Sequence, residues 1–217
     1  TAVMSALAAM SLSQTAIAAD PVLDANVDNP AGTTITGTSG YGVKLDAGGP
    51  YTVANSGEIS STAGTLSYGI LINDLYDTDS LVVNSLINSG VIYGEATATN
   101  NGYGIAIHDY GTITTLTNSG TISGSVNNNI AMGLFLSSST ITTLTNNGLI
   151  SGSANNYDAY GIYMDNSSIN TLTNAGTISG LVTNGETGAG IYLEESTITT
   201  LNNSGLINFI SDGYDTN

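Results

Sequence analysis

Hydrophobic positions in this chain fall in short segments that never follow a helical period. The segment 161–164, Gly-Ile-Tyr-Met, alternates as a half-buried strand does. The segment 113–117, Ile-Thr-Thr-Leu-Thr, is rich in β-branched residues, which favour strands. The segment 120–124, Gly-Thr-Ile-Ser-Gly, is a third short apolar stretch bounded by turn residues. This pattern predicts three short strands in each unit and no helix.

The three segments recur in a fixed order along the chain. A glycine opens each copy of the third segment, and an isoleucine stands two positions after it in all six copies. A second glycine, which opens the first segment and follows a tyrosine in four of six copies, keeps step with the first. Such a period predicts the coils of a solenoid, with a repeat of about 28 residues. The opening glycines are 33, 30, 28, 28 and 29 residues apart, at Gly57, Gly90, Gly120, Gly148, Gly176 and Gly205.

The predicted fold class is therefore all-β, a right-handed parallel β-helix. Leucine-rich repeats have a similar period, but they need a helical segment that the Ser, Asn and Gly of 124–129 and 152–156 disfavour. In a β-helix, equivalent Ile and Leu stack in buried columns about 4.8 Å apart. Ile113 and Leu116 are three positions apart, so the chain should bend between them for both to point inward.

Three regions are predicted along the chain. Residues 1–19 carry a small-apolar run that ends in Ala-Ile-Ala-Ala, which is typical of the final part of a secretory signal peptide. An N-terminal helix packed on the domain is the alternative for this run. Residues 20–40 are expected to form an N-terminal cap or first coil, and residues 41–217 the β-helix repeats. The coil after Ile207 stops at Asn217, so we expect the repeat region to be truncated at its C-terminus.

Composition excludes several functions. One Lys or Arg stands against 17 Asp and Glu, which gives a net charge of −16. With Lys44 as its only base, the chain cannot neutralise phosphates in numbers, so nucleic-acid binding and anionic membrane surfaces are excluded. The absence of cysteine removes thiol catalysis, cysteine-bound zinc and disulfides. No cofactor is expected.

An asparagine two positions before the opening glycine is the most regular polar feature. Asparagine at a turn tolerates left-handed backbone and bonds to nearby backbone groups. Stacked in register, these amides would form a ladder of hydrogen bonds along the solenoid. We interpret the column as structural, because a ligand site occupies one coil and not all of them. Its members are Asn55, Asn88, Asn118, Asn146, Asn174 and Asn203.

Candidate chemistry is sparse. His108 is the sole histidine, no Gly-x-Ser-x-Gly motif accompanies it, and we expect it to be an exposed residue at the end of the strand 103–107. The best acidic column is Asp165, Glu194 and Glu195, and coils in register would place Asp165 beside Glu194. A solvated turn is the favoured interpretation of this column. A bound divalent cation and a hydrolytic carboxylate pair are the alternatives.

The longest departure from the period is the acidic segment 73–80, which contains Asp77-x-Asp79. This spacing hints at calcium, but the glycine and the distal glutamate of a helix-loop-helix calcium site are missing. We therefore expect a solvated loop.

The leader, the acidic cysteine-free composition and repeats such as Thr-Leu-Thr-Asn-Ser-Gly-Thr-Ile-Ser-Gly (115–124) resemble the passenger region of bacterial autotransporters, which use type V secretion. The resemblance covers about residues 33–210 and implies a parallel β-helix that is exported and displayed at the bacterial cell surface, on the outer membrane. It implies adhesion or self-association, with a cell-surface or matrix ligand or a second copy as partner. Contact with the outer membrane would come only through a C-terminal barrel missing from this sequence. The chain is not expected to be an enzyme; the alternative is a carbohydrate-active β-helix enzyme, similar to polysaccharide lyases or hydrolases.

Overall fold

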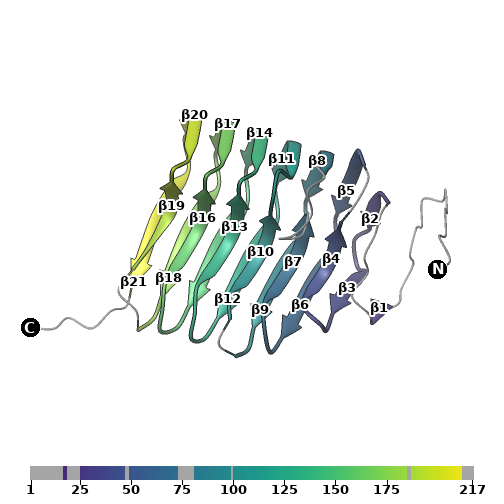
Figure 1. Ribbon diagram of the computed structural model, residues 1–217, viewed down its shortest axis with the longest axis horizontal. Coiled ribbons are helices and arrows are strands. Elements are labelled where there is room, and N and C mark those ends of the chain that lie inside the picture. The colour runs from purple at the N-terminus through teal and green to yellow at the C-terminus, as the bar shows by residue number, and fades with distance from the viewer. Residues whose placement is uncertain are drawn as a thin grey trace, which may run out of the picture.

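The computed structural model describes residues 17–18, 25–46, 49–72, 81–98, 100–184 and 187–211. Within these residues the chain forms only β-strands, arranged as three parallel sheets that wind into a solenoid (Figure 1). Paired residues of neighbouring coils lie 28 positions apart in the most regular part, as in Thr112 with Thr140. The predicted all-β solenoid is confirmed. The acidic segment 73–80 lies outside the described residues.

From β4 onward the chain passes through the sheets in the order B, C, A in each coil, and every pairing between coils is parallel. Sheet B comprises β4 (Tyr41–Leu45), β7 (Ser67–Ile72), β10 (Gly102–Ile107), β13 (Ala131–Ser137), β16 (Ala159–Asp165) and β19 (Gly188–Glu194). Sheet C comprises β2 (Val27–Asn29), β5 (Tyr51–Asn55), β8 (Val82–Asn88), β11 (Thr112–Asn118), β14 (Thr140–Asn146), β17 (Ser168–Asn174) and β20 (Thr197–Asn203). Sheet A comprises β1 (Ile17–Ala18), β3 (Thr34–Gly37), β6 (Glu58–Ala63), β9 (Val91–Ala96), β12 (Thr121–Val126), β15 (Leu149–Ala154), β18 (Thr177–Val182) and β21 (Leu206–Ser211).

The main core is a set of aliphatic columns enclosed by the three sheets. Ile122 pairs with Ile92 on one side and Ile150 on the other, and all three are fully buried. Ile113 and Leu116 are also fully buried, while Thr114 and Thr115 between them both lie toward solvent. The strict alternation of β11 therefore breaks at this point, as the spacing of its apolar residues predicted.

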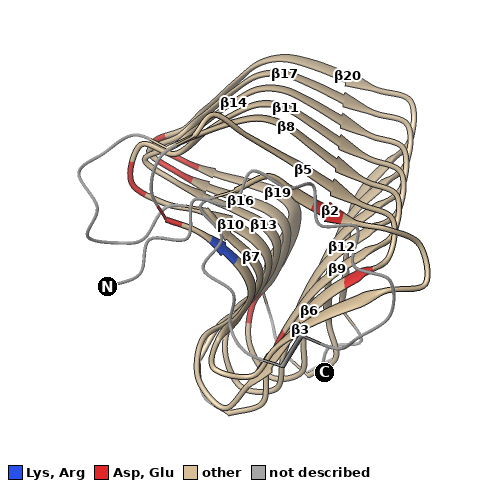
Figure 2. Cartoon of the chain, turned by 90° about the vertical axis from the view of Figure 1, so that its right-hand side faces the viewer, with Lys and Arg blue, Asp and Glu red and all other residues tan. Residues whose placement is uncertain are grey.

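Sheets A and B meet backbone to backbone at the glycines of the repeat. A Cβ atom on Gly104 would lie 2.8 Å from the backbone nitrogen of Ser123, and one on Gly124 would collide with the carbonyl oxygen of Met132. In the view along the solenoid, sheet B accordingly curves inward between sheets A and C (Figure 2). A second, smaller core lies beyond this contact. It consists of Ala96, Val126, Ala131, Ala154, Ala159 and Val182.

Candidate functional site

The asparagine column forms a continuous hydrogen-bonded ladder inside the solenoid. Asn118 donates from Nδ2 to Oδ1 of Asn146 at 2.8 Å, and Asn146 donates to Asn174 at 2.7 Å. Each amide also donates to a backbone oxygen of the next coil, as Asn118 does to Leu149 at 3.0 Å. The backbone nitrogen of Asn147 in turn donates to the Asn118 carbonyl at 2.7 Å. All the amides point the same way, so each coil specifies the register of the next.

The ladder has a seventh member that the sequence period did not reveal. Asn29 is 2% exposed and donates from Nδ2 to Oδ1 of Asn55 at 2.7 Å. Its own Oδ1 accepts the hydroxyl of Thr33 at 2.6 Å, which completes this end of the ladder. The alignment on the opening glycine missed it because two extra residues separate Asn29 from Ile35, compared with Asn55 and Ile59.

The left-handed backbone expected at the asparagines lies instead at the turn between sheets B and C. Ser138, Asn166 and Glu195 have φ values of 50°, 47° and 46°, whereas the ladder asparagines do not have positive φ. The next residue in each of these turns is a serine, and the serines bond from coil to coil. The hydroxyl of Ser167, for example, accepts the backbone N–H of Ser139 at 3.0 Å. The ladder asparagines close their strands with extended backbone, so their side chains turn inward.

The acidic column lies on this solvent-facing turn. Asp165 ends β16 and Glu194 ends β19. The two residues are in register on neighbouring strands, as the repeat predicted. Glu195 occupies the next position, where the preceding coil has Asn166. Oε2 of Glu194 accepts the Tyr163 hydroxyl at 2.6 Å, so this carboxylate already has a partner. Among the described residues, no group of three or more His, Asp or Glu is arranged to hold a metal ion.

An aromatic cluster covers the outer face of sheet B. The rings of Tyr68 and Tyr103 stack at 4.8 Å, and those of Tyr163 and Tyr192 at 5.0 Å. Phe135 connects the two pairs, with its ring centre 5.4 Å from Tyr103 and 5.8 Å from Tyr163. Because neighbouring coils stack their rings on one another, most of these rings contact rings of the next coil, and only Tyr192 in the last coil is as much as 41% exposed. We interpret this cluster as a structural element and not as a platform for ligands.

Two tyrosines of this cluster, Tyr163 and its neighbour Tyr160, have strongly perturbed ionisation. Burial raises the pKa of Tyr160 to about 12, and the carboxylate of Asp158, 3.3 Å from its hydroxyl, adds to the effect. Burial likewise raises the pKa of Tyr163, together with the hydrogen bond to Glu194. Both phenols therefore stay neutral and keep donating to carboxylates well above neutral pH.

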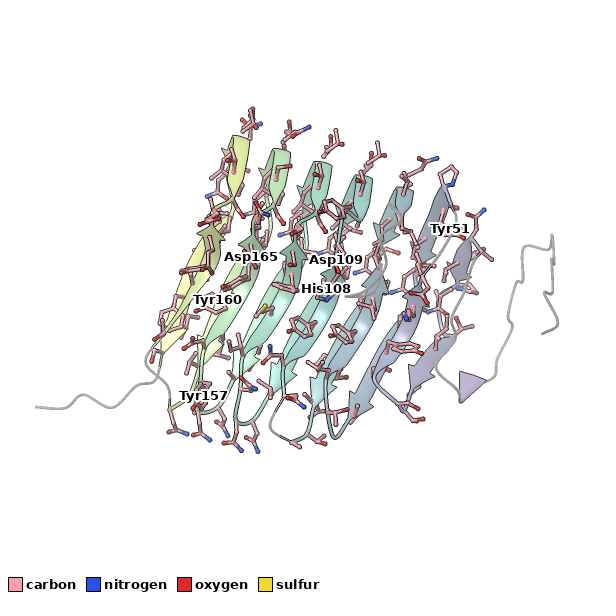
Figure 3. The ribbon with its side chains drawn as sticks, in the orientation of Figure 1. Tyr51, His108, Asp109, Tyr157, Tyr160 and Asp165 are labelled. Carbon is pink, nitrogen blue, oxygen red and sulfur yellow. The ribbon has the colours of Figure 1, made fainter. Side chains whose placement is uncertain are left out.

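His108 is buried and not exposed as the sequence predicted. It follows β10 directly, and 4% of its surface is accessible. Its ring lies edge-on to Tyr68 at 6.2 Å and to Phe135 at 5.3 Å, so the aromatic cluster covers it (Figure 3). The sequence could not show that neighbouring coils supply the rings that cover this side chain. Lys44, the only Lys or Arg in the sequence, forms an ion pair with Asp46 at 3.1 Å.

The outer face of sheet C is a regular array of hydroxyl groups, which we call the hydroxyl face. Thr115 pairs with Thr143, and Thr143 with Thr171, so equivalent hydroxyls lie one strand spacing apart. The strands β5 to β20 of this sheet contain no Asp, Glu, Lys or Arg. The face is defined by the columns Thr112, Thr140, Ser168 and Thr197; Thr115, Thr143, Thr171 and Thr200; and Thr117, Thr145, Thr173 and Asn202.

Comparison with known proteins gives no relative: no family model, curated protein or solved structure matches this chain. Over the part of the chain that is described, no helix has the length and apolar character needed to span a membrane.

Proposed function

We propose that this chain is an exported, surface-displayed β-solenoid of the autotransporter-passenger kind, which acts by adhesion or self-association and not by catalysis. The hydroxyl face is the observation that carries this proposal. It is regular over successive coils and free of charge in a protein with a net charge of −16. A face without charge is where two such acidic molecules can approach with least repulsion, and its hydroxyls can both donate and accept hydrogen bonds.

The enzymatic alternative has less support. A lyase needs a base to remove a proton, and the only Lys is paired with Asp46 on a coil remote in sequence from the acidic column. A hydrolytic pair at Asp165 and Glu194 would need both carboxylates for substrate, but Glu194 accepts the hydroxyl of Tyr163.

A competing mode of association uses the last coil. Among the described strands, β19, β20 and β21 each have a neighbour on one side only, and they expose Leu193, Leu201 and Leu206 by 43 to 50%. Unpaired strand edges of this kind can pair with another chain. The experiment must therefore separate this edge from the hydroxyl face.

Charged substitutions on two faces make that separation. The variant T115E/T143E/T171E places three carboxylates on the hydroxyl face, and S123E/S151E/S179E places three on sheet A at equally half-buried outward positions. We expect sedimentation velocity to show that the wild-type protein and the sheet A variant self-associate, and that the sheet C variant remains monomeric. Association of both variants at the wild-type level would instead indicate the strand edges.

A further inference from the structure

A shallow polar groove of about 320 Å³ lies where sheet A ends and the chain turns toward sheet B. It is lined from four successive coils, at the ends of β9, β12, β15 and β18. Parallel strands are about 4.8 Å apart, so the four coils span about 14 Å along the solenoid axis. The groove is therefore elongated in the direction of the axis, and its volume lies at the lower end of the range for ligand sites.

The two central coils of the groove present the same pair of polar residues, a serine and an asparagine. Ser125 and Ser153 pair with one another in neighbouring coils, and Glu95 precedes them in the same column. Asn127 and Asn155 line the adjacent position, and Asn155 donates from Nδ2 to Oδ1 of Asn127 at 2.8 Å. This bond leaves the Asn127 Nδ2 donor and the Asn155 Oδ1 acceptor without a hydrogen bond to any other described residue. Both groups remain for a ligand.

Two tyrosines are near the lining residues of this groove in the sequence. The Tyr93 hydroxyl interacts with the side chains of Ser125 and Glu95, so Tyr93 lies beside the first coil of the groove. Tyr157 follows Asn155 and Asn156 on the same turn and is 57% exposed, at the lower edge of the molecule in Figure 3. Tyr157 has a larger accessible surface than the buried rings Tyr68, Tyr103 and Tyr160 of sheet B.

The chemistry of the lining excludes most ligand classes. Glu95 is the only charged residue of the lining, so an anionic polymer is repelled and a metal ion lacks ligands. A peptide that binds by strand addition would need a free strand edge, but β12 and β15 are paired on both sides. What remains is a neutral chain with hydroxyl groups along its length.

We infer that this groove binds a linear neutral glycan, with successive sugar residues lying along the solenoid axis. The hydroxyls of Ser125 and Ser153 and the amides of Asn127 and Asn155 bond to sugar hydroxyls, and Glu95 accepts from one of them. The inference deepens the adhesive part of the proposed function and rests on it for its biological role. The hydroxyl face on sheet C takes no part in it.

Affinity electrophoresis tests this inference with galactomannan, hydroxyethyl cellulose and dextran as neutral probes and polygalacturonate as an anionic probe. The variant S153L fills the groove, and S151L places the same side chain two residues earlier on β15, outside the lining. We expect at least one neutral polysaccharide to retard the wild-type protein and S151L equally, with affinity for S153L lower by at least about tenfold. Polygalacturonate should not retard any of them.

Three results would overturn the inference: no retardation by any neutral probe, equal retardation of S153L, or preference for polygalacturonate. The variant T115E/T143E/T171E should still bind the glycan, because its substitutions lie on another sheet. Loss of glycan binding with intact self-association refutes only the groove. A wild-type protein that binds the glycan but does not self-associate refutes only the hydroxyl face.

Discussion

Buried asparagine is costly unless its amide is fully bonded, and the ladder meets this condition in every interior coil. Asn88, Asn118, Asn146 and Asn174 are all fully buried, and each donates to both a side chain and a backbone oxygen of the next coil. A shift of one residue would leave every one of these amides unsatisfied. The column therefore opposes slippage between coils as well as contributing stability.

The first prediction concerns this ladder. Replacing Asn146 with Ala removes its bonds to Asn174 and to the Thr177 carbonyl, and it leaves the Asn118 amide without its side-chain acceptor. We expect the free energy of unfolding to fall by about 1–3 kcal/mol, measured by urea denaturation. The matched control is Asn156→Ala, which removes an exposed amide bond to Asn128 and should cost much less. Equal losses in the two variants would contradict the ladder's role.

The second prediction concerns pH. Tyr160 has a pKa raised to about 12 in the folded protein, against about 10 in an unfolded chain. The unfolded state thus loses its proton first, so the stabilisation is fully present below pH 10 and is lost as pH rises toward 12. Melting temperature should fall over this range, and less so in Tyr160→Phe. If the melting temperature of Tyr160→Phe falls as steeply with pH as that of the wild-type protein, other groups control alkaline unfolding.

Among the elements, the opening glycines hold consecutive coils together. A Cβ atom on Gly120 would collide with the carbonyl oxygen of Gly90, and its other near neighbours are also backbone atoms that cannot turn aside. We therefore predict that Gly120→Ala lowers the free energy of unfolding by about 1–3 kcal/mol in thermal or urea denaturation. Gly64→Ala is the control, because a Cβ atom there meets no atom within 4 Å. If Gly64→Ala destabilises the protein as much as Gly120→Ala does, the close approach of backbone atoms does not explain why glycine is needed at the opening positions.

Most of the strand arrangement could be predicted from the sequence, because the repeat places the same residue type at the same position of each coil. The period predicted the coils. The asparagine column that includes Asn118 and the isoleucine column that includes Ile122 predicted the register between them. What periodicity could not show was contact between sheets: the inward curve of sheet B depends on glycines such as Gly104 meeting sheet A. The burial of His108 depends on rings from neighbouring coils.

The candidate sites were less predictable. The repeat in the sequence indicated that Asp165 would be in register with Glu194. It could not indicate that the Tyr163 hydroxyl donates to Glu194. The groove at the end of sheet A was not found at all, because Ser and Asn are common throughout the chain. Only the three-dimensional path shows which of them gather in one hollow.

At the scale of the whole molecule, net charge disfavours self-association and the hydroxyl face favours it. A net charge of −16 repels a second copy, while the hydroxyl face offers hydrogen bonds without charge. Raising the salt concentration from 0.1 to 1 M shortens the Debye length from about 10 to about 3 Å. We therefore predict that light scattering shows association increasing with salt. A monomer at all salt concentrations would count against self-association and favour binding to a surface ligand.

The distance between spin labels on two copies tests directly whether their hydroxyl faces meet. The chain has no cysteine, so a single label can be placed on the hydroxyl face at Thr143→Cys or on sheet A at Ser151→Cys. If the hydroxyl faces meet, pulsed electron paramagnetic resonance in 1 M salt shows a defined distance between labels at 143, and none that is comparably short at 151. A short, defined distance at 151 with none at 143 would contradict the proposed interface.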